Sequence, residues 1–88
     1  MIEREARIMN SLGLHARPAA QIVRLAATFA AHIELEKDGL AVNAKSIMGV
    51  MMLAAESGST LRIRAEGDDE SQAVTALAEL VASGFGET

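Results

Sequence analysis

The stretch GLHARP, residues 13–18, holds the features from which the fold can be worked out. Just before His15, Asn10 and Gly13 are residue types that favour turns. After it, apolar residues recur with a helical period. Pro18 is tolerated in the first turn of a helix, because its missing N–H would have no partner there. The stretch therefore predicts a short loop that leads into a helix, with His15 at the helix N-terminus.

The N-terminus of this predicted helix is a place that can hold an anion. The first N–H groups of a helix have no partner within it, and the helix dipole adds about half a positive charge. Histidine is an established nucleophile in covalent catalysis, and Arg17 places a fixed cation two residues away. The combination predicts a histidine that accepts a phosphoryl group, because that reaction depends mainly on positioning and charge stabilisation.

Further elements follow from the hydrophobic pattern on both sides of this stretch. We expect strands at residues 2–9, 32–36, 40–43 and 60–66, and helices at residues 16–30, 47–53 and 70–83. Asp38 and Gly39 predict a hairpin turn between two of the strands. Asp69 is expected to begin the last helix in a capping box with Gln72, and Gly84 is expected to end it.

The order of these elements and the alternation within the strands predict the fold class. Residues 60–66 alternate most clearly, with Leu61, Ile63 and Ala65 inward and the charged residues between them outward. Four such strands and three helices predict an α+β protein, in which an open sheet has helices on one face and water on the other.

The composition excludes several classes of protein. Half of the 88 residues are apolar and only two are aromatic, so aliphatic side chains have to build the core. A net charge of -4 and the lack of stacking residues argue against nucleic-acid binding. With two His and no Cys we expect no metal site, and no Ser or Asp stands in an evident nucleophile motif. No cofactor is expected.

The N-terminal segment, MIEREARIM, has charges spread through it. It therefore predicts neither a signal peptide nor membrane insertion. We expect a cytoplasmic protein, with residues 1–88 forming a single domain.

A second segment, AKSIMGVMMLA, begins at Ala44. Ser46 is a natural N-cap for the short helix that follows, and a sharper hypothesis makes it a kinase target. Met48, Met51 and Met52 exceed what one face of that helix can bury. Flexible methionine side chains suit docking, so the segment predicts an apolar surface left for a partner. The second histidine, His32, has no such neighbours and is expected to be structural.

Two motifs and the spacing between them resemble the HPr family, the histidine-containing phosphocarriers of the bacterial phosphotransferase system. These motifs are GLHARPAA around His15 and NAKSIMGVMML around Ser46. The resemblance covers essentially the whole chain, so residues 1–88 are identified as one HPr-type domain. It implies an open-faced β-sandwich with strand order 1-4-2-3.

The resemblance also implies a role for each motif. His15 would accept a phosphoryl group on Nδ1 from phosphorylated Enzyme I and pass it to an EIIA-type protein, as a carrier and not as an enzyme. Arg17 and the backbone at Ala16 would receive the phosphate, and HPr kinase/phosphorylase would phosphorylate Ser46. The protein would be a monomer. The implied docking surface comprises Ala20, Arg24, Ile47, Met48 and Met51.

Two alternatives stay open. NSLGLHARP, with Leu12, and the ending LVASGFGE look like the nitrogen-related branch called NPr, whereas KSIMGVM looks like HPr proteins that are substrates of the serine kinase. A rival from another class is a non-catalytic binding module, in which Met48 and Met51 regulate a partner and His15 matters little.

Overall fold

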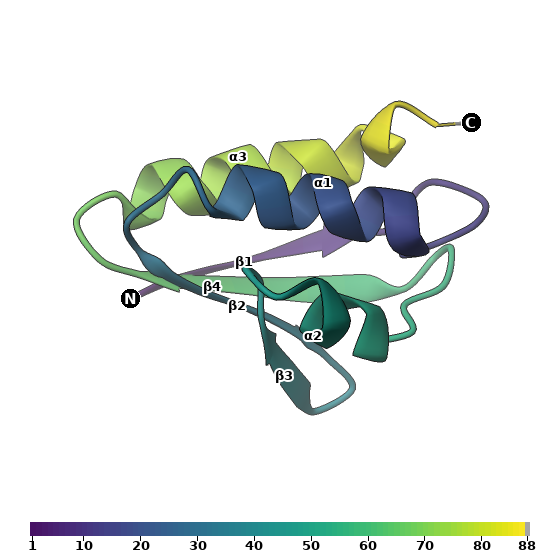
Figure 1. Ribbon diagram of the computed structural model, residues 1–88, viewed down its shortest axis with the longest axis horizontal. Helices are drawn as coiled ribbons and strands as arrows, with labels where there is room; N and C mark the ends of the chain where they lie inside the picture. The colour runs from purple at the N-terminus through teal and green to yellow at the C-terminus, as the bar shows by residue number, and fades with distance from the viewer. Residues whose placement is uncertain (88) are drawn as a thin grey trace.

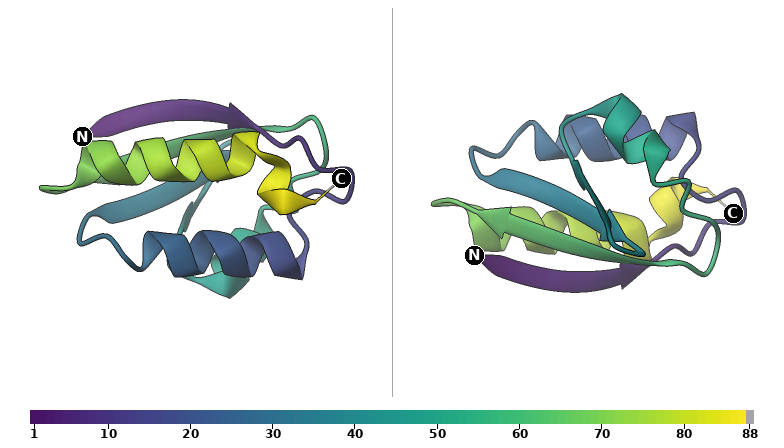
Figure 2. Two further views of the ribbon diagram at one scale, coloured as in Figure 1. Left: turned by 90° about the horizontal axis from the view of Figure 1, so that it is seen from above. Right: turned by 90° about the horizontal axis from the view of Figure 1, so that it is seen from below.

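A computed structural model describes residues 1–87. It contains strands β1 (Ile2–Arg7), β2 (His32–Lys37), β3 (Leu40–Asn43) and β4 (Thr60–Glu66), helices α1 (Ala16–Ala26), α2 (Ile47–Met52) and α3 (Glu70–Ala82), and a 3-10 turn η1 (Gly84–Gly86). The strands form one antiparallel sheet in the order β1-β4-β2-β3. Helices α1 and α3 lie across one face, and α2 packs beside α1 and β3 (Figures 1 and 2). The predicted α+β class and strand order are confirmed.

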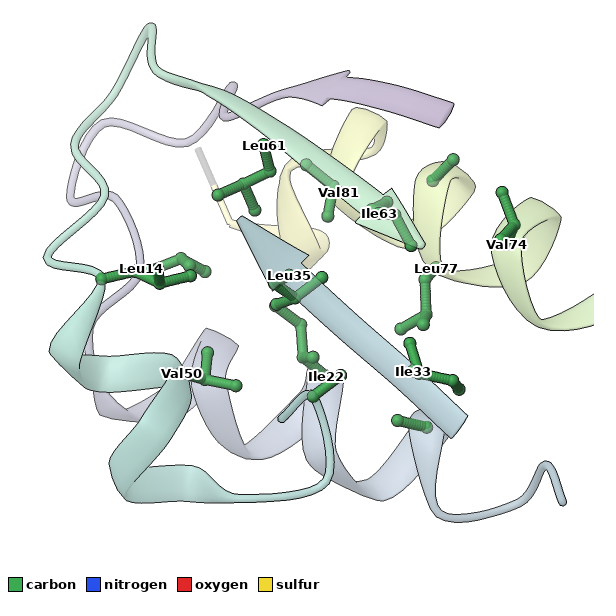
Figure 3. Close-up of a cluster of buried hydrophobic side chains, with 14 of the residues drawn as sticks. Leu14, Ile22, Ile33, Leu35, Val50, Leu61, Ile63, Val74, Leu77 and Val81 are labelled. Atoms are coloured by element: carbon green, nitrogen blue, oxygen red, sulfur yellow. The ribbon is translucent and has the colours of Figure 1, made fainter. Parts of the chain in front are cut away.

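The core lies between the sheet and the helices. Leu61 and Ile63 on β4 and Ile33 and Leu35 on β2 are fully buried on the same face of the sheet, as the alternation predicts. Each helix adds apolar side chains to this layer, among them Ile22, Val50, Val74, Leu77 and Val81 (Figure 3). None of the helices among residues 1–87 combines the length and the apolar composition that spanning a bilayer requires.

The opposite face of the sheet carries a ladder of ion pairs. Arg64 lies between Glu3 on β1, at 3.1 Å, and Glu34 on β2, at 3.7 Å, and also contacts Glu36. Arg62 forms the next rung, with cross-strand partners on the same two strands. Cross-strand pairs of opposite charge suit a solvated sheet face, so the predicted wet face is confirmed.

Asp69 accounts for two differences from the predicted elements. Its carboxylate accepts hydrogen bonds from the backbone N–H groups of Ala30, at 2.8 Å, and Ala31, at 2.9 Å, and these bonds lower its pKa. The carboxylate is therefore not free to form a capping box with Gln72, and that prediction is wrong. The helix expected to reach Ala30 ends at Ala26, in part because the N–H groups beyond it bond to Asp69.

The remaining differences are small. β1 ends at Arg7 although alternation continues to Met9. β3 alternates weakly, because it is an edge strand on which only Val42 is partly buried and Leu40 stays 44% exposed. Gly84 follows the last helix with positive φ, as predicted. The last residue of the predicted domain, Thr88, lies outside the described residues.

Candidate functional site

His15 is the residue that immediately precedes α1, where the backbone is extended and the side chain is 35% exposed. The chain arrives there through a tight turn, in which the Gly13 N–H donates to the Asn10 carbonyl at 3.2 Å. Leu14, which lies between Gly13 and His15, is buried, and its N–H donates to the carbonyl of Ala55 at 2.8 Å. A buried side chain and a backbone hydrogen bond thus fix the position of His15 at the helix start.

The first turn of α1 leaves backbone donors free. The Ala19 N–H bonds to the carbonyl of His15 at 3.1 Å, and Pro18 has no N–H to offer. The N–H groups of Ala16 and Arg17 have no hydrogen bond within residues 1–87. Two free donors at the positive end of a helix suit an anion. The predicted helix start is confirmed, whereas the phosphate-binding role remains a prediction.

A carboxylate lies against the imidazole of His15. Both oxygens of Glu87 are 3.0 Å from Nε2, and the Glu87 side chain is only 16% exposed. An ionised carboxylate accepts hydrogen bonds and cannot donate them, so Nε2 has to carry the proton. In a neutral ring the lone pair is then on Nδ1, on the other side of the imidazole.

The sequence alone did not predict Glu87 as part of the site. It belongs to the C-terminal segment that follows α3, at the end of the molecule where α1 begins (Figures 1 and 2). Its carboxylate also accepts a hydrogen bond, at 3.0 Å, from Asn10, which was predicted only as a turn residue and is almost completely buried. Glu87 is 72 residues from His15 in the sequence, so no local pattern could have paired them.

We expect the contact between Glu87 and His15 to depend on pH. The hydrogen bond from His15 is the main cause that lowers the pKa of Glu87 below its usual value of 4.5, and Asn10 and the charge of Arg17 act in the same direction. The stabilisation is therefore complete above that usual value and is lost as pH falls through the lowered pKa. Carboxyl NMR of Glu87 should show the low midpoint, and His15→Ala should raise it. An unchanged midpoint in the variant would contradict the contact.

Arg17 is exposed on the first turn of α1. No carboxylate among residues 1–87 lies within ion-pairing distance of its guanidinium, although its charge contributes to the lowered pKa of Glu87. An arginine near His15 whose donors are uncommitted can turn toward an arriving phosphoryl group.

Ser46 is the N-cap of α2, as predicted. Its hydroxyl oxygen accepts a hydrogen bond from the N–H of Gly49 at 3.1 Å. A Cβ on Gly49 would lie 3.3 Å from the Ser46 hydroxyl oxygen, a mildly tight contact beside the capping bond, and 3.4 Å from Val42, which is ordinary contact. Lys45, just before the serine, donates to the carbonyl of Phe29 at 2.8 Å.

The apolar side chains of α2 divide between the core and the surface. Val50 and Leu53 are buried, while Met48 is 77% exposed and Met51 is 43% exposed. α2 packs against α1, which carries the part-buried Ala20 and the exposed Arg24. The predicted surplus of apolar groups on α2 is confirmed; their docking role stays a prediction. Further exposed apolar side chains are Ile47 and Met52 on α2 and Met9 and Leu12 in the loop before His15.

The second histidine, His32, lies on a strand and not at the N-terminus of a helix. Its side chain is 65% exposed at the start of β2, and Nε2 lies 3.4 Å from Glu34. It lines a shallow hollow on the charged face of the sheet, with Met1 and Arg64.

An open-faced α+β sandwich with a part-exposed histidine at the start of a helix defines the class of small histidine phosphocarriers. A family model described as the PTS HPr component phosphorylation site matches residues 2–83. The chain belongs to the HPr family, the phosphocarriers of the phosphotransferase system.

Known relatives agree with this assignment. The phosphocarrier protein HPr of Cupriavidus necator is 48% identical over 87 residues, which cover 99% of this chain and 98% of that protein. The crystal structure of HPr-C-His from Thermoanaerobacter tengcongensis superimposes with a TM-score of 0.95 at 50% identity, covering 100% of this chain and 99% of that one. A crystal structure of Crh from Bacillus subtilis, described as a swapped dimer, has a TM-score of 0.77 at 42% identity and covers 100% and 98%.

Proposed function

We propose that His15 accepts a phosphoryl group on Nδ1 from phosphorylated Enzyme I and donates it to an EIIA-type protein. The observation that carries this proposal is the contact of Nε2 with Glu87, at 3.0 Å, because it leaves Nδ1 as the nitrogen with a free lone pair. The free N–H groups of Ala16 and Arg17 support the same reaction, since they can receive the oxygens of the arriving group.

The transfer needs no proton to move. The lone pair of Nδ1 forms a bond to phosphorus, while the bond from phosphorus to the donor breaks and leaves its electron pair on the donor. The ring of His15 gains a positive charge, which the carboxylate of Glu87 neutralises. Passing the group to the acceptor reverses these steps.

Incubation with Enzyme I and phosphoenolpyruvate tests this proposal. We expect one acid-labile phosphoryl group per chain, which an EIIA-type protein then removes. The rival hypothesis, a non-catalytic module that binds partners through Met48 and Met51, predicts no labelling. A chain that stays unlabelled with active Enzyme I would contradict the proposal.

Replacing Arg17 should slow the transfer without affecting the fold. We expect Arg17→Ala to reduce the rate about 100-fold, because it removes charge stabilisation from the reacting phosphoryl group. Thermal unfolding should change little, since the side chain is exposed. Arg17→Lys keeps the charge but not the planar fork, and should give an intermediate rate. If Arg17→Ala unfolds the protein while transfer per folded molecule is unaffected, the assigned role is wrong.

We infer that Ser46 is a regulatory phosphorylation site for a kinase of the HPr kinase/phosphorylase type. Phosphate would add about -1.5 to -2 charge beside the exposed Met48 and Met51. Ser46→Asp should therefore slow transfer from Enzyme I about tenfold, or about 1.4 kcal/mol in the barrier. Ser71→Asp, on the exposed first turn of α3, adds the same charge elsewhere and should change little. Undiminished transfer to Ser46→Asp would count against the inference.

The proposed docking surface comprises Ala20, Arg24, Ile47, Met48 and Met51. A small phosphoryl donor, phosphoramidate, separates docking from chemistry, because it can reach His15 without binding to this surface. Ser46→Asp should therefore be labelled by phosphoramidate at the wild-type rate. Slow labelling by both donors would place the effect at His15 itself.

We also propose the branch of the family, the cellular location and the oligomeric state of this protein. The relatives described above are named HPr or Crh, which favours the HPr branch over the nitrogen-related branch. We propose a cytoplasmic monomer, as the resemblance to the HPr family implies. A swapped dimer like that described for Crh is the alternative, and light scattering distinguishes the two.

A further inference from the structure

The C-terminal segment is held in place by several independent contacts. Phe85 is buried, with only 4% of its surface exposed, although its backbone has a φ of 60°, in the left-handed region. Its carbonyl accepts a hydrogen bond from the side chain of Gln21 on α1 at 3.1 Å. A residue other than glycine persists in that region only where its surroundings hold it. The segment is therefore built into the fold as far as Glu87.

Asn10 is the group that joins this segment to the loop before His15. Its Nδ2 donates to the Gly13 carbonyl at 2.8 Å and to Glu87 Oε1 at 3.0 Å. Its Oδ1 is buried with no partner within the described residues. Flipping the amide would place Oδ1 against two oxygens that can only accept hydrogen bonds. The observed orientation, in which Nδ2 donates to both, is therefore the one that satisfies them. Burying an amide oxygen without a hydrogen-bond partner destabilises the fold. The two hydrogen bonds that Nδ2 donates offset that cost.

We propose that Asn10 is a positioning residue for phosphoryl transfer, whose buried amide holds the Glu87 carboxylate against Nε2 of His15. The inference rests on the proposed function. Glu87 alone has a side chain with several rotatable bonds, and the bond from Asn10 restricts it to one place. With the carboxylate fixed there, the proton stays on Nε2 and the lone pair of Nδ1 points to the incoming phosphorus. The same carboxylate balances the charge that the ring gains when the nitrogen–phosphorus bond forms and the donor's bond breaks.

A double-mutant cycle tests whether Asn10 acts through Glu87. Asn10→Ala, Glu87→Ala and the double variant would be compared with wild type, with phosphoramidate as the donor. We expect each single variant to be labelled about tenfold more slowly, and the double variant to be no slower than the slower single one, because both changes break the same link. Rate losses that multiply in the double variant would overturn the proposal.

Nitrogen NMR of the labelled imidazole gives a readout that a purely structural role would not move. In wild type the neutral ring should hold its proton on Nε2, and the fraction on Nδ1 should rise in both single variants. Leu53→Ala removes a buried side chain outside this cluster. It should lower stability while leaving the tautomer and the rate per folded molecule unchanged. An unchanged tautomer and rate in Asn10→Ala would also overturn the proposal.

Two further variants keep the test decisive. If Asn10→Ala does not fold, Asn10→Ser replaces two amide protons with one hydroxyl proton and can serve only one of the two acceptors. Glu87→Gln keeps the shape of the side chain, removes its charge and should slow labelling. Failure of this inference is distinct from failure of the proposed function: in the first case wild type is labelled on His15 and the cycle is additive, and in the second wild type is not labelled.

Discussion

His15→Ala is expected to abolish phosphoryl acceptance from both Enzyme I and phosphoramidate. The imidazole is the nucleophile of the proposed reaction, and no other group at the start of α1 can form the bond to phosphorus. The fold should survive, because the side chain is 35% exposed and lies outside the buried core. The measurement is the acid-labile phosphate per chain after incubation with phosphoenolpyruvate and Enzyme I.

His32 supplies the matched control for this prediction. It is the other histidine of the chain, it is more exposed, and it too lies near a carboxylate, at 3.4 Å. It lacks the free N–H groups of a helix start. The arginine that lines the same hollow, Arg64, is already engaged in ion pairs with three glutamates, unlike Arg17. His32→Ala should therefore be labelled like wild type. Full labelling of His15→Ala, or loss of labelling in His32→Ala, would show that the phosphoryl group is carried elsewhere.

Much of the fold could be predicted because each element has a local signal. Alternation places Leu61 and Ile63 inward on β4, and Asp38 and Gly39, both with positive φ, form the predicted hairpin turn. The predicted capping box is absent because of a contact between residues that are far apart in the sequence. Asp69 is at the start of α3, where its carboxylate would ordinarily cap its own helix, but it bonds the backbone beyond α1 instead. No pattern within either segment indicates that partnership.

The candidate site also combines residues that local sequence predicts with a residue that it does not predict. His15 at a helix start and Ser46 as an N-cap follow from residues next to them in the sequence. The partner of the imidazole does not, because Glu87 is brought there by the turn at η1 and by the amide of Asn10. The sequence therefore predicts that His15 is the residue that reacts, and the resemblance implies reaction on Nδ1. The fold adds the carboxylate against Nε2, which leaves Nδ1 as the nitrogen with a free lone pair.

Gly13→Ala should destabilise the protein more than any other single methyl group added near the site. Gly13 has a φ of 69°, and a Cβ there would be 2.5 Å from the carbonyl oxygen of Ala55. That oxygen accepts the hydrogen bond from Leu14 that fixes the start of α1. The left-handed backbone costs an alanine about 1–2 kcal/mol, and the displaced backbone adds to it. We expect a loss of about 3 kcal/mol and a melting temperature lower by roughly 15 °C.

Gly39→Ala separates the two causes of this loss. Gly39 also has a positive φ, of 85°, but nothing lies within 4 Å of the position of its Cβ. That variant should lose only about 1 kcal/mol, with normal labelling of His15. Gly13→Ala should also be labelled slowly per folded molecule, because a shift of Leu14 moves His15 away from Glu87. Equal losses of stability in the two variants would mean that the contact with Ala55 does not hold the histidine in place.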